Sequence, residues 1–462
     1  MIESGHKQFV PFEHQREAAE LWHDRGRMLD FSGCGTGKTL SCIHAVKTYW
    51  PDARVLVLGP LSILEPAWLK DIQFGWPETT AEVAYARNRE KVFMGNAQWI
   101  ITNHDAIKTV WKEQWQHLFD IIIIDEGDIF RNRTSDRSRA AANVCLSIPN
   151  AIVMTGTPTP NTVLDVWHLA FLIDRGERLG KNYYGFRQQV CTPQAIPGVA
   201  KAMKWTDKPM ANDLVTSMLA DITHRVRLED VQELPDIITR EITVKLPTKL
   251  KREYEELKRN SMLMLESGEL LNAVHAGSRM QKMLQLLSGA VYNENGEPKD
   301  LHTDRHSLVL DMVEETDHAL VAFNWHHQKD GLVKAAKARQ RAGTLGKFAV
   351  IDGSTKVAVR NQIVEQYQNG QIHVIFAHPQ SAGHGLTLTK ANRIIWASPT
   401  YRADLYEQFN HRIYRTGQTR KTEIIHIAAD GTAEQEVYEK LMGKVSRMDD
   451  LLTTLVELSQ AA

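Results

Sequence analysis

Residues Met28–Thr39 read MLDFSGCGTGKT, an apolar run that leads into a glycine-rich loop, and the helix-like run LSCIHAVKTYW follows it. Glycines in such a loop allow backbone N–H groups to converge on phosphate oxygens without clashes from Cβ atoms. Lys38 can then reach the β- and γ-phosphates of a nucleotide, the hydroxyl of Thr39 can ligate Mg²⁺, and the helix start adds a favourable dipole. This order of strand, loop and helix predicts a P-loop made of Ser32, Gly33, Cys34, Gly35, Thr36, Gly37, Lys38 and Thr39.

One position of this loop departs from the usual pattern G-x-x-x-x-G-K-T, because Ser32 stands where the first glycine is expected. Three other glycines keep the loop permissive, so we treat Ser32 as a tolerated variant. A glycine-rich turn with an incidental lysine is the alternative, and the flanking strand and helix patterns disfavour it.

A second signal is the acidic run Asp125-Glu126-Gly127-Asp128, which directly follows four consecutive isoleucines. Open α/β sheets place ligands at the carboxyl ends of their strands. Asp125 can hold Mg²⁺ through water, and Glu126 can orient and deprotonate an attacking water. An acidic strand end alone is often only a solvated cap. Together with the P-loop, it predicts that the protein binds ATP with Mg²⁺ and hydrolyses it.

Short apolar runs recur along both halves of the chain, and stretches of helical length separate them. Such alternation predicts α/β architecture with parallel sheets, one in each half. The region from Asp174 to Leu301 is richer in charged residues and predicts helical insertions plus a linker. The expected strands lie at Arg54–Gly59, Gln98–Asn103, Asp120–Asp125, Ala151–Thr155, Leu320–Asn324, Phe348–Asp352, His373–Ala377, Arg393–Ala397 and Ile424–Ala428.

The composition sets outer bounds. The 462 residues are 43% hydrophobic and 24% charged, which excludes a mostly disordered chain. Lys and Arg total 55 against 56 Asp and Glu, so polyanion binding through bulk charge is disfavoured while local basic patches stay open. The four cysteines form no C-x-x-C pair, and no signal peptide or membrane span is expected. We expect a cytoplasmic protein with no membrane partner.

Further stretches, in a fixed order along the chain, carry a family pattern. Phe12, His14 and Gln15 resemble an adenine-reading glutamine motif. The other stretches are Leu58–Trp68 (LGPLSILEPAW), Thr102–His104 (TNH), Met154–Asn161 (MTGTPTPN), Val321–Gln328 (VAFNWHHQ), Ser381–Ala391 (SAGHGLTLTKA) and Gln408–Gln418 (QFNHRIYRTGQ). Together with the P-loop and acidic run they resemble a Swi/Snf-type DNA translocase of helicase superfamily two, most like the small phage and prophage members.

This resemblance implies two tandem RecA-like P-loop lobes, each a parallel sheet flanked by helices, with Swi/Snf-type helical insertions between them. Residues 1–172 would form the ATP-binding first lobe and 173–233 its helical insertion. Residues 234–306 would form a linker and the helical insertion of the second lobe. Residues 307–462 would form the second lobe with a C-terminal amphipathic helix.

The resemblance also implies roles for single residues. Gly385, Arg412 and Arg415 join the nucleotide site, while Asp128, Thr155, Gly156, Thr157 and Gln408 couple hydrolysis to DNA binding. Ser62, Thr102, Asn103, Asn324, Ser354 and Thr387 are implied contacts to the DNA backbone. His384 and Thr387 replace the glycine and asparagine that the family has in SAGHGLTLTKA.

Basic residues add two expectations. Arg412 and Arg415 share a helix face, so two guanidinium groups can stabilise a γ-phosphate, although an isolated R-x-x-R is more often solvated surface. The run Lys334–Lys347 contains no acid, and we expect phosphate contact there, through Lys334, Lys337, Arg339 and Arg341.

Three functions are weighed. The first is a monomeric, ATP-dependent translocase on duplex, forked or branched DNA, held mainly by the phosphate backbone, for branch migration, annealing or protein displacement. The second is a strand-separating helicase. The third is an ATP-driven remodeller of a protein partner on DNA.

Overall fold

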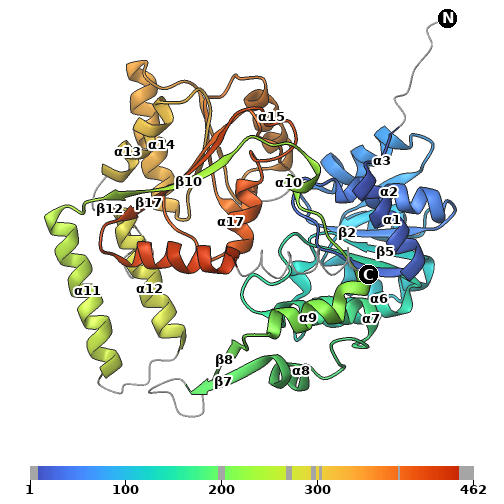
Figure 1. The fold of residues 1–462 in the computed structure, drawn as a ribbon. Coiled ribbons are helices and arrows are strands. Elements are labelled where there is room, and N and C mark those ends of the chain that lie inside the picture. The colour runs from blue at the N-terminus through green and yellow to red at the C-terminus, as the bar shows by residue number, and fades with distance from the viewer. Residues whose placement is uncertain are drawn as a thin grey trace, which may run out of the picture. The chain divides into compact units, whose positions relative to one another are not determined.

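The structure is a computed structural model that describes residues 9–195, 203–266, 273–292, 298–300, 304–382 and 386–446. The chain forms two compact units, the first mainly from Met1–Thr192 and Thr206–Glu233 and the second mainly from Leu234–Val445. Each unit is built on a parallel sheet, as Figure 1 shows. The predicted fold class, two α/β lobes with parallel sheets, is confirmed.

The sheet of the first unit has the strand order β3-β4-β2-β5-β6-β1-β9, and every neighbouring pair is parallel. The carboxyl ends of all the strands therefore lie along the same edge of the sheet, and the loops after β1 and β5 lie there. The strands are β1 (Arg27–Asp30), β2 (Val55–Gly59), β3 (Ala81–Ala84), β4 (Trp99–Asn103), β5 (Ile121–Ile124), β6 (Asn150–Met154) and β9 (Thr223–His224).

Helices cover this sheet and close its core. Trp22, Ile43 and Trp68 are buried against strand residues such as Val57 and Ile123. The helices are α1 (Glu13–Arg25), α2 (Lys38–Tyr49), α3 (Lys70–Gly75), α4 (Arg89–Phe93), α5 (Ala106–Lys112), α6 (Asp136–Ser147), α7 (Trp167–Asp174), α8 (Tyr183–Val190), α9 (Ala211–Leu219) and α10 (Leu228–Val231). Short helical turns occur at η1 (Leu64–Leu69), η2 (Trp115–Leu118), η3 (Gly127–Phe130), η4 (Val163–Val166) and η5 (Ala220–Ile222).

The sheet of the second unit has the order β10-β17-β16-β13-β15-β14 and is also parallel throughout. Leu320 and Ala322 enter one apolar cluster while Val321 and Phe323 enter another, so the sheet is buried on both faces. The strands are β10 (Ile237–Val244), β13 (Ala319–Ala322), β14 (Phe348–Ile351), β15 (Val374–Ala377), β16 (Arg393–Trp396) and β17 (Thr422–Ala429).

Helices of the second unit complete its core, and residues 433–446 are helical as well. The remainder of the predicted C-terminal helix lies outside the described residues. The helices are α11 (Thr248–Glu266), α12 (Ala273–Leu287), α13 (Asp304–Glu314), α14 (His326–Ala342), α15 (Val357–Gln368), α16 (Pro379–Ala382) and α17 (Ala403–Asn410). Two short two-stranded sheets pair β7 (Cys191–Ala195) with β8 (Met203–Asp207) and β11 (Ala290–Tyr292) with β12 (Pro298–Asp300).

The central region differs from the expectation of helices and a linker. Thr223–His224 form β9 at one edge of the first sheet, and Ile237–Val244 form β10 at one edge of the second. β10 reads IITREITV and is largely exposed. Edge strands mix polar and apolar residues, so they lack the continuous apolar run that marks a buried strand. The expectation of a linker at 237–244 was therefore wrong.

A buried ion pair crosses the second unit. Arg305 and Glu434 are almost fully buried, with Nη2 and Oε2 2.6 Å apart. Arg305 Nη1 also donates to the carbonyl of Ala397 at 3.0 Å, and Glu434 Oε2 accepts from the backbone N–H of Ala429 at 2.8 Å. The pair fixes the start of α13 against the helix that begins at residue 433.

We expect Arg305→Leu to lower the free energy of unfolding by about 3–5 kcal/mol, because the Glu434 carboxylate would stay buried without its cation. Urea unfolding followed by circular dichroism measures the loss. Arg240→Leu is the control, because its pair with Glu423 is partly exposed and contributes less than about 1 kcal/mol. Equal losses in the two variants would contradict this role for the buried pair.

Candidate active site

The predicted P-loop connects β1 to α2. Gly35 and Gly37 have φ angles of 89° and 83°, in the left-handed region that glycine adopts readily. A Cβ at position 37 would come within 2.4 Å of Gln15 Nε2. The Lys38 ammonium donates to the carbonyls of Ser32 at 2.7 Å and Gly33 at 2.9 Å. These neutral acceptors are weaker partners for a cation than phosphate oxygens, so the lysine is already placed to turn toward an anion.

The residues upstream of the loop lie against it, as the glutamine motif implies. His14 Nε2 is 2.9 Å from the carbonyl of Thr36, and Gln15 Nε2 donates to the carbonyl of Gly37 at 3.4 Å. Gln15 Oε1 also accepts from the backbone N–H of Phe12 at 2.9 Å. The ring of Phe12 stacks on that of His14 and is 57% exposed, so it offers a flat apolar surface beside the loop.

Ser32, the residue in place of the usual glycine, has a bonding role. Its hydroxyl accepts from the backbone N–H of Val226 at 3.2 Å and lies 3.2 Å from His224 Nδ1. The backbone N–H of Gly33 donates to the carbonyl of Val226 at 2.9 Å. The P-loop is therefore bonded to the segment that follows β9. A glycine at position 32 would lack the hydroxyl that makes two of these contacts.

A buried carboxyl lies directly before this loop. Asp30 Oδ1 accepts from the backbone N–H of Ser32 at 2.9 Å and is 3.7 Å from His224 Nδ1. Burial alone would raise the pKa of Asp30, but His224, Lys38 and Ser32 stabilise the carboxylate and hold the pKa below its usual value. Neither Asp30 nor His224 was among the predicted site residues. They meet because β1 pairs with β9, and a local sequence pattern does not reveal contacts between strands so far apart in the chain.

The acidic run follows β5 at the same edge of the sheet. Asp125 Oδ2 accepts from Trp68 Nε1 at 2.9 Å, and Oδ1 accepts from the backbone N–H of Glu126 at 3.0 Å. Burial, followed by the charge of Glu126, raises the pKa of Asp125 to about 6, although Trp68 and Lys38 oppose the shift. A cation bound beside Asp125 would favour the charged form of this carboxyl. Trp68 lies within the motif Leu58–Trp68, but its contact with Asp125 was not predicted.

Glu126 and Asp128 occupy distinct environments. Glu126 has a φ of 51°, an unusual conformation for a residue other than glycine, which turns the chain sharply after β5. Asp128 Oδ2 accepts from Arg131 Nη2 at 3.0 Å. His104 Nε2 is 2.7 Å from the carbonyl of Asp125. The acidic run is therefore held by the motif that follows β4.

Three of the five residues predicted to couple hydrolysis to DNA binding, Thr155, Gly156 and Thr157, directly follow β6. Thr155 and Thr157 are buried, and the backbone N–H of Thr157 donates to Thr155 Oγ1 at 3.2 Å. A Cβ on Gly156 would lie 3.4 Å from Cys34 Sγ, so this loop passes directly beside the P-loop. The first unit thus brings the P-loop, the acidic run and the TGT loop together at one edge of its sheet.

The residues of the first unit that were predicted to contact DNA differ in their exposure to solvent. Thr102 is fully buried and its hydroxyl donates to the carbonyl of Ala84 at 2.7 Å, so a direct backbone contact by this side chain was a wrong expectation. Its side chain points into the sheet because alternate residues of a strand face opposite sides. Asn103 is half-buried and accepts from Arg89 Nη2 at 3.0 Å, and Ser62 is half-buried.

In the second unit, Asn324 Nδ2 donates to the carbonyls of Ser398 at 3.0 Å and Pro399 at 3.1 Å. Its amide thus joins the loops after β13 and β16. Ser354 is exposed, with its hydroxyl donating to Asp352 Oδ1 at 2.6 Å, and Thr387 is half-buried. Gly385 and the neighbouring His384 lie outside the described residues.

The two predicted arginines differ in exposure. Arg412 is buried, with Nε donating to the carbonyl of Gln408 at 2.7 Å. Arg415 is less buried, and its Nη1 donates to the carbonyl of Leu386 at 3.1 Å. Gln408 is itself 2% exposed. Arg412 therefore fixes the turn after α17, while Arg415 lies nearer solvent.

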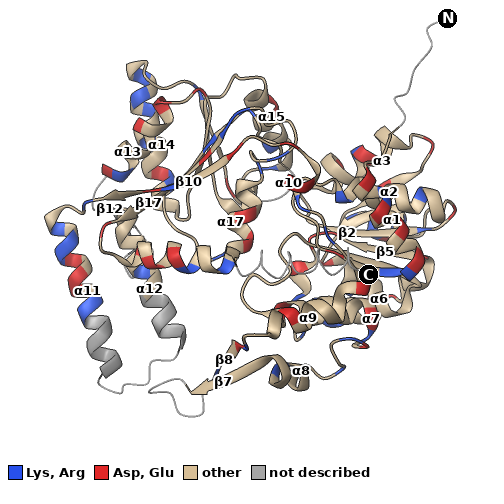
Figure 2. Ribbon diagram, viewed as in Figure 1, with Lys and Arg blue, Asp and Glu red and all other residues tan. Residues whose placement is uncertain are grey.

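Helix α14 carries the acid-free basic run, and Figure 2 shows the basic residues along it. Lys334, Lys337 and Arg341 are exposed. Arg339 instead pairs with Asp311 at 2.6 Å and Glu314 at 2.8 Å, two acids of α13. The run lacks acids in sequence but not in space, so the charge of Arg339 is shared with two carboxylates, while Lys334, Lys337 and Arg341 are exposed.

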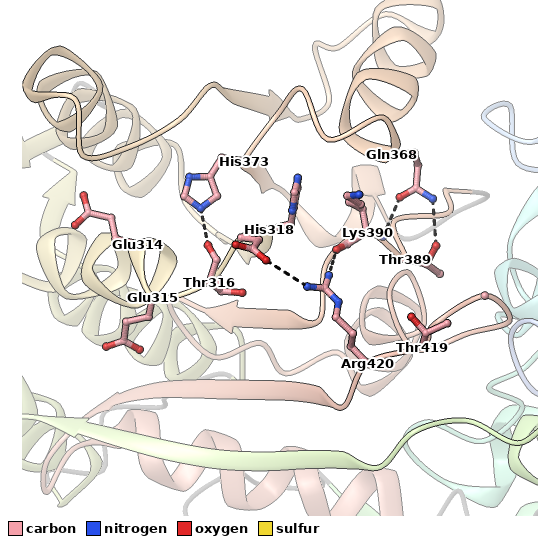
Figure 3. A pocket seen from close by; sticks show the side chains of 12 residues that line it. Glu314, Glu315, Thr316, His318, Gln368, His373, Thr389, Lys390, Thr419 and Arg420 are labelled. Atoms are coloured by element: carbon pink, nitrogen blue, oxygen red, sulfur yellow. Dashed lines mark hydrogen bonds and ion pairs between the residues drawn. The ribbon is translucent and has the colours of Figure 1, made fainter.

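A separate cavity of about 790 Å³ lies in the second unit, and Figure 3 shows its polar lining. His318 and His373 line it immediately before β13 and β15, at the amino ends of the strands. Its three acids each have a basic neighbour, with Glu314 near Arg339, Glu315 near Arg393 and Asp317 near Arg420. None of the predicted site residues lines this cavity, although Arg339 pairs with Glu314, which does.

Comparison with known proteins decides the family. The SNF2-related domain matches residues 18–292, which is more than half of the chain. The chain belongs to the SNF2-related family. The helicase conserved C-terminal domain matches residues 304–420. With both domains, this SNF2-related chain is a DNA-dependent ATPase of helicase superfamily two, as the sequence predicted.

Relatives of this SNF2-related chain differ in length. "Putative protein p41" of Acyrthosiphon pisum secondary endosymbiont phage 1 is 27% identical over 97% of this chain and 99% of its own, which agrees with the predicted likeness to phage members. Human "DNA excision repair protein ERCC-6" is 23% identical over 89% of this chain but 30% of its own. Human "DNA annealing helicase and endonuclease ZRANB3" is 24% identical over 94% of this chain and 40% of its own.

Among solved structures, the Sulfolobus solfataricus SWI2/SNF2 ATPase core in complex with dsDNA is 18% identical. It covers 100% of this chain and 97% of its own, with a TM-score of 0.43. Within the described part of this SNF2-related chain, no helix is both long and apolar enough to cross a membrane.

Proposed function

We propose that the protein is an ATP-driven motor that moves along double-stranded or branched DNA, for branch migration, strand annealing or displacement of bound proteins. One observation carries the proposal. The P-loop, the acidic run and the TGT loop meet at one edge of the first sheet, so a change at the γ-phosphate reaches a loop implied in DNA coupling. The names of relatives, which include a DNA annealing helicase and DNA excision repair proteins, support DNA as the partner.

Mg²⁺ is part of this proposal, held by Thr39 and Asp125. Mg²⁺ usually takes one or two protein oxygens and completes its shell with phosphates and waters. The buried Asp125 carboxyl, whose pKa is raised to about 6, fits this role because a cation beside it would restore the charged form. When bound, the ion would neutralise charge that develops on the transferred phosphoryl group.

Roles for the chain's own residues follow. Lys38 would bind the β- and γ-phosphates, and Glu126 would orient the attacking water. Arg415 would contribute the cation that stabilises the transition state. Arg412, which is buried on the carbonyl of Gln408, would position Arg415 rather than contact the nucleotide. Asp128, Thr155, Gly156, Thr157 and Gln408 remain proposed coupling residues, and Gly385 a proposed nucleotide contact.

Contacts to the DNA backbone are proposed for the polar side chains that the structure leaves accessible. Hydroxyl, amide and ammonium groups bind phosphate and sugar without reading sequence, so movement along any sequence is expected. These residues are Ser62, Asn103, Ser354, Thr387, Lys334, Lys337 and Arg341.

We expect duplex, forked or four-way DNA to stimulate ATP hydrolysis more than single strands, and RNA alone not to stimulate it. Steady-state ATPase rates measured side by side with each nucleic acid test this. Stimulation by RNA alone would overturn the proposal. Hydrolysis that depends on a protein partner but not on DNA would favour a remodeller of that partner instead.

A displacement assay on a forked duplex separates the motor from a strand-separating helicase. ATP-dependent release of a protein bound to the duplex, without release of a labelled strand, is expected for the motor. Release of the labelled strand in proportion to ATP hydrolysed would favour strand separation.

A further inference from the structure

The basic run Arg131–Arg139 of the first unit contains arginines with two kinds of partner. Arg137 forms bonds of 2.9 and 3.0 Å to the two carboxylate oxygens of Asp105, and Arg139 pairs with Asp136 at 2.5 Å. Arg133 is different, because its guanidinium carbon lies over the aromatic rings of neighbouring tyrosines. Its distances to the ring centres are 4.4 Å for Tyr183 and 4.9 Å for Tyr184.

A tyrosine ring holds a cation in place without cancelling its charge, which a carboxylate would do. Tyr183 and Tyr184 begin α8, and Asn182 Oδ1 accepts from the backbone N–H of Tyr184 at 2.9 Å, so both rings are carried by a capped helix start. A second guanidinium, that of Arg187, lies 5.2 Å from the ring centre of Tyr184. Tyr184 is 54% exposed, so this basic and aromatic cluster faces solvent.

A cavity of about 300 Å³ adjoins Arg133, and most of its polar lining can donate hydrogen bonds. The residues able to donate are Arg131, Asn132, Arg133 and Tyr183, whereas the hydroxyls of Thr134 and Thr162 already donate to Asn132 Oδ1 and Asp207 Oδ1. The carboxyl in its wall, Asp165, accepts from the backbone N–H of Asn161 at 3.0 Å and of Thr162 at 3.4 Å. Burial raises the pKa of Asp165, whereas the charge of Arg131 and the hydrogen bonds from Asn161 and Thr162 oppose that rise.

The cavity lies between two elements already linked to the active site. Arg131, in its wall, holds Asp128 of the acidic run at 3.0 Å, and Thr162 directly follows the motif that contains Gly156. The same run reaches Asp105 through Arg137, two residues beyond Asn103. A phosphate backbone that touches Asn103 could therefore continue along this run.

We propose that Arg133, supported by Tyr183 and Tyr184, binds a phosphate of the DNA backbone at this cavity. The proposal rests on the proposed function, since it assigns that function a contact on the first unit. Guanidinium, amide and hydroxyl donors suit phosphate and carry no sequence information. Because Arg131 joins the cavity to Asp128, the contact gives DNA a short route to the acidic run.

Arg133→Ala tests the contact. We expect the Kd for a fluorescent duplex to rise about 10-fold, equally for unrelated sequences, since one charge-assisted contact is lost. The slope of log K against log salt should fall in magnitude by about 1. Arg139→Ala is the control from the same run, and its Kd and salt slope should change less than those of Arg133→Ala because Arg139 pairs with Asp136.

The tyrosines provide a second readout that loss of folding would not mimic. Tyr184→Phe keeps the ring under the guanidinium and should retain the Kd of the unchanged protein, whereas Tyr184→Ala should raise it. If Arg133→Ala melts at a lower temperature, the neutral Arg133→Gln replaces it in the salt series.

The outcomes separate the two proposals. If DNA stimulates the unchanged protein but Arg133→Ala and Arg133→Gln keep its Kd and salt slope, the Arg133 contact is wrong and the motor stands. If DNA neither binds nor stimulates the unchanged protein, the motor and the contact fail together.

Discussion

Lys38→Ala should reduce ATP hydrolysis by about 10²–10³-fold or more and weaken ATP binding, because the loop would lose the cation placed to reach the β- and γ-phosphates. In the structure this ammonium bonds only to the neutral carbonyls of Ser32 and Gly33. The charge of Lys38 also stabilises the buried carboxylates of Asp30 and Asp125, so some loss of thermal stability is expected beside the larger loss of nucleotide chemistry. Steady-state hydrolysis, binding of a fluorescent ATP analogue and a melting curve measure the three quantities.

Lys47→Ala is the matched control, because Lys47 lies near the other end of the same helix, where its ammonium donates to Gln98 Oε1 at 3.3 Å. It should retain normal hydrolysis. Hydrolysis in Lys38→Ala at the level of Lys47→Ala would show that the glycine-rich loop is not the phosphate site.

Glu126→Gln should lower kcat by about 10²–10⁴-fold while leaving ATP binding intact, because the amide keeps the size of the side chain but cannot accept the proton of the attacking water. Glu126 follows β5 in a left-handed conformation with a φ of 51°, which commits this position to the turn beside Asp125. Single-turnover hydrolysis and binding of an ATP analogue separate chemistry from affinity.

The removal of one negative charge beside Asp125 has a second expected effect. The charge of Glu126 contributes to the raised pKa of Asp125, so Glu126→Gln should lower that pKa. Glu65→Gln is a control on the same unit, since Glu65 Oε1 accepts from the Tyr85 hydroxyl at 2.8 Å and takes no part in the acidic run. A kcat for Glu126→Gln equal to that of Glu65→Gln would exclude Glu126 as the base.

Buried strands were predictable because their sequences are continuous apolar runs. The four isoleucines 121–124 became β5, and the run HVIFA became β15 with one residue fewer. β3, β9 and β10 were not predicted, because each lies at or beside a sheet edge and its residues are only partly buried. Pairing partners far away in the chain, such as β1 for β9, leave no mark in a local window.

The nucleotide site was more accessible to sequence reasoning than the DNA surface. Spacing within the P-loop and the acidic run is local chemistry, and the structure brings those residues to one sheet edge. The direction of a side chain and its hydrogen-bond or ion-pair partners depend instead on residues that are distant in sequence. Thr102 faces inward, and Arg339 meets acids that lie on another helix. The contact between Arg133 and Tyr183 could not be predicted for the same reason, because the two residues lie about 50 positions apart in the chain (183 minus 133).

The pairing of β10 with β17 has a consequence for synthesis on the ribosome. Ile237 pairs with Thr422, so the edge strand of the second sheet leaves the ribosome 185 residues before its partner (422 minus 237). Residues up to Glu233 can fold during that interval, while the unpaired β10 waits. Arg240 and Glu241, in the middle of its sequence IITREITV, place charges on the waiting strand, and charged edges resist pairing with other chains. We therefore expect the charged residues of β10 to limit its pairing with other chains before β17 is made.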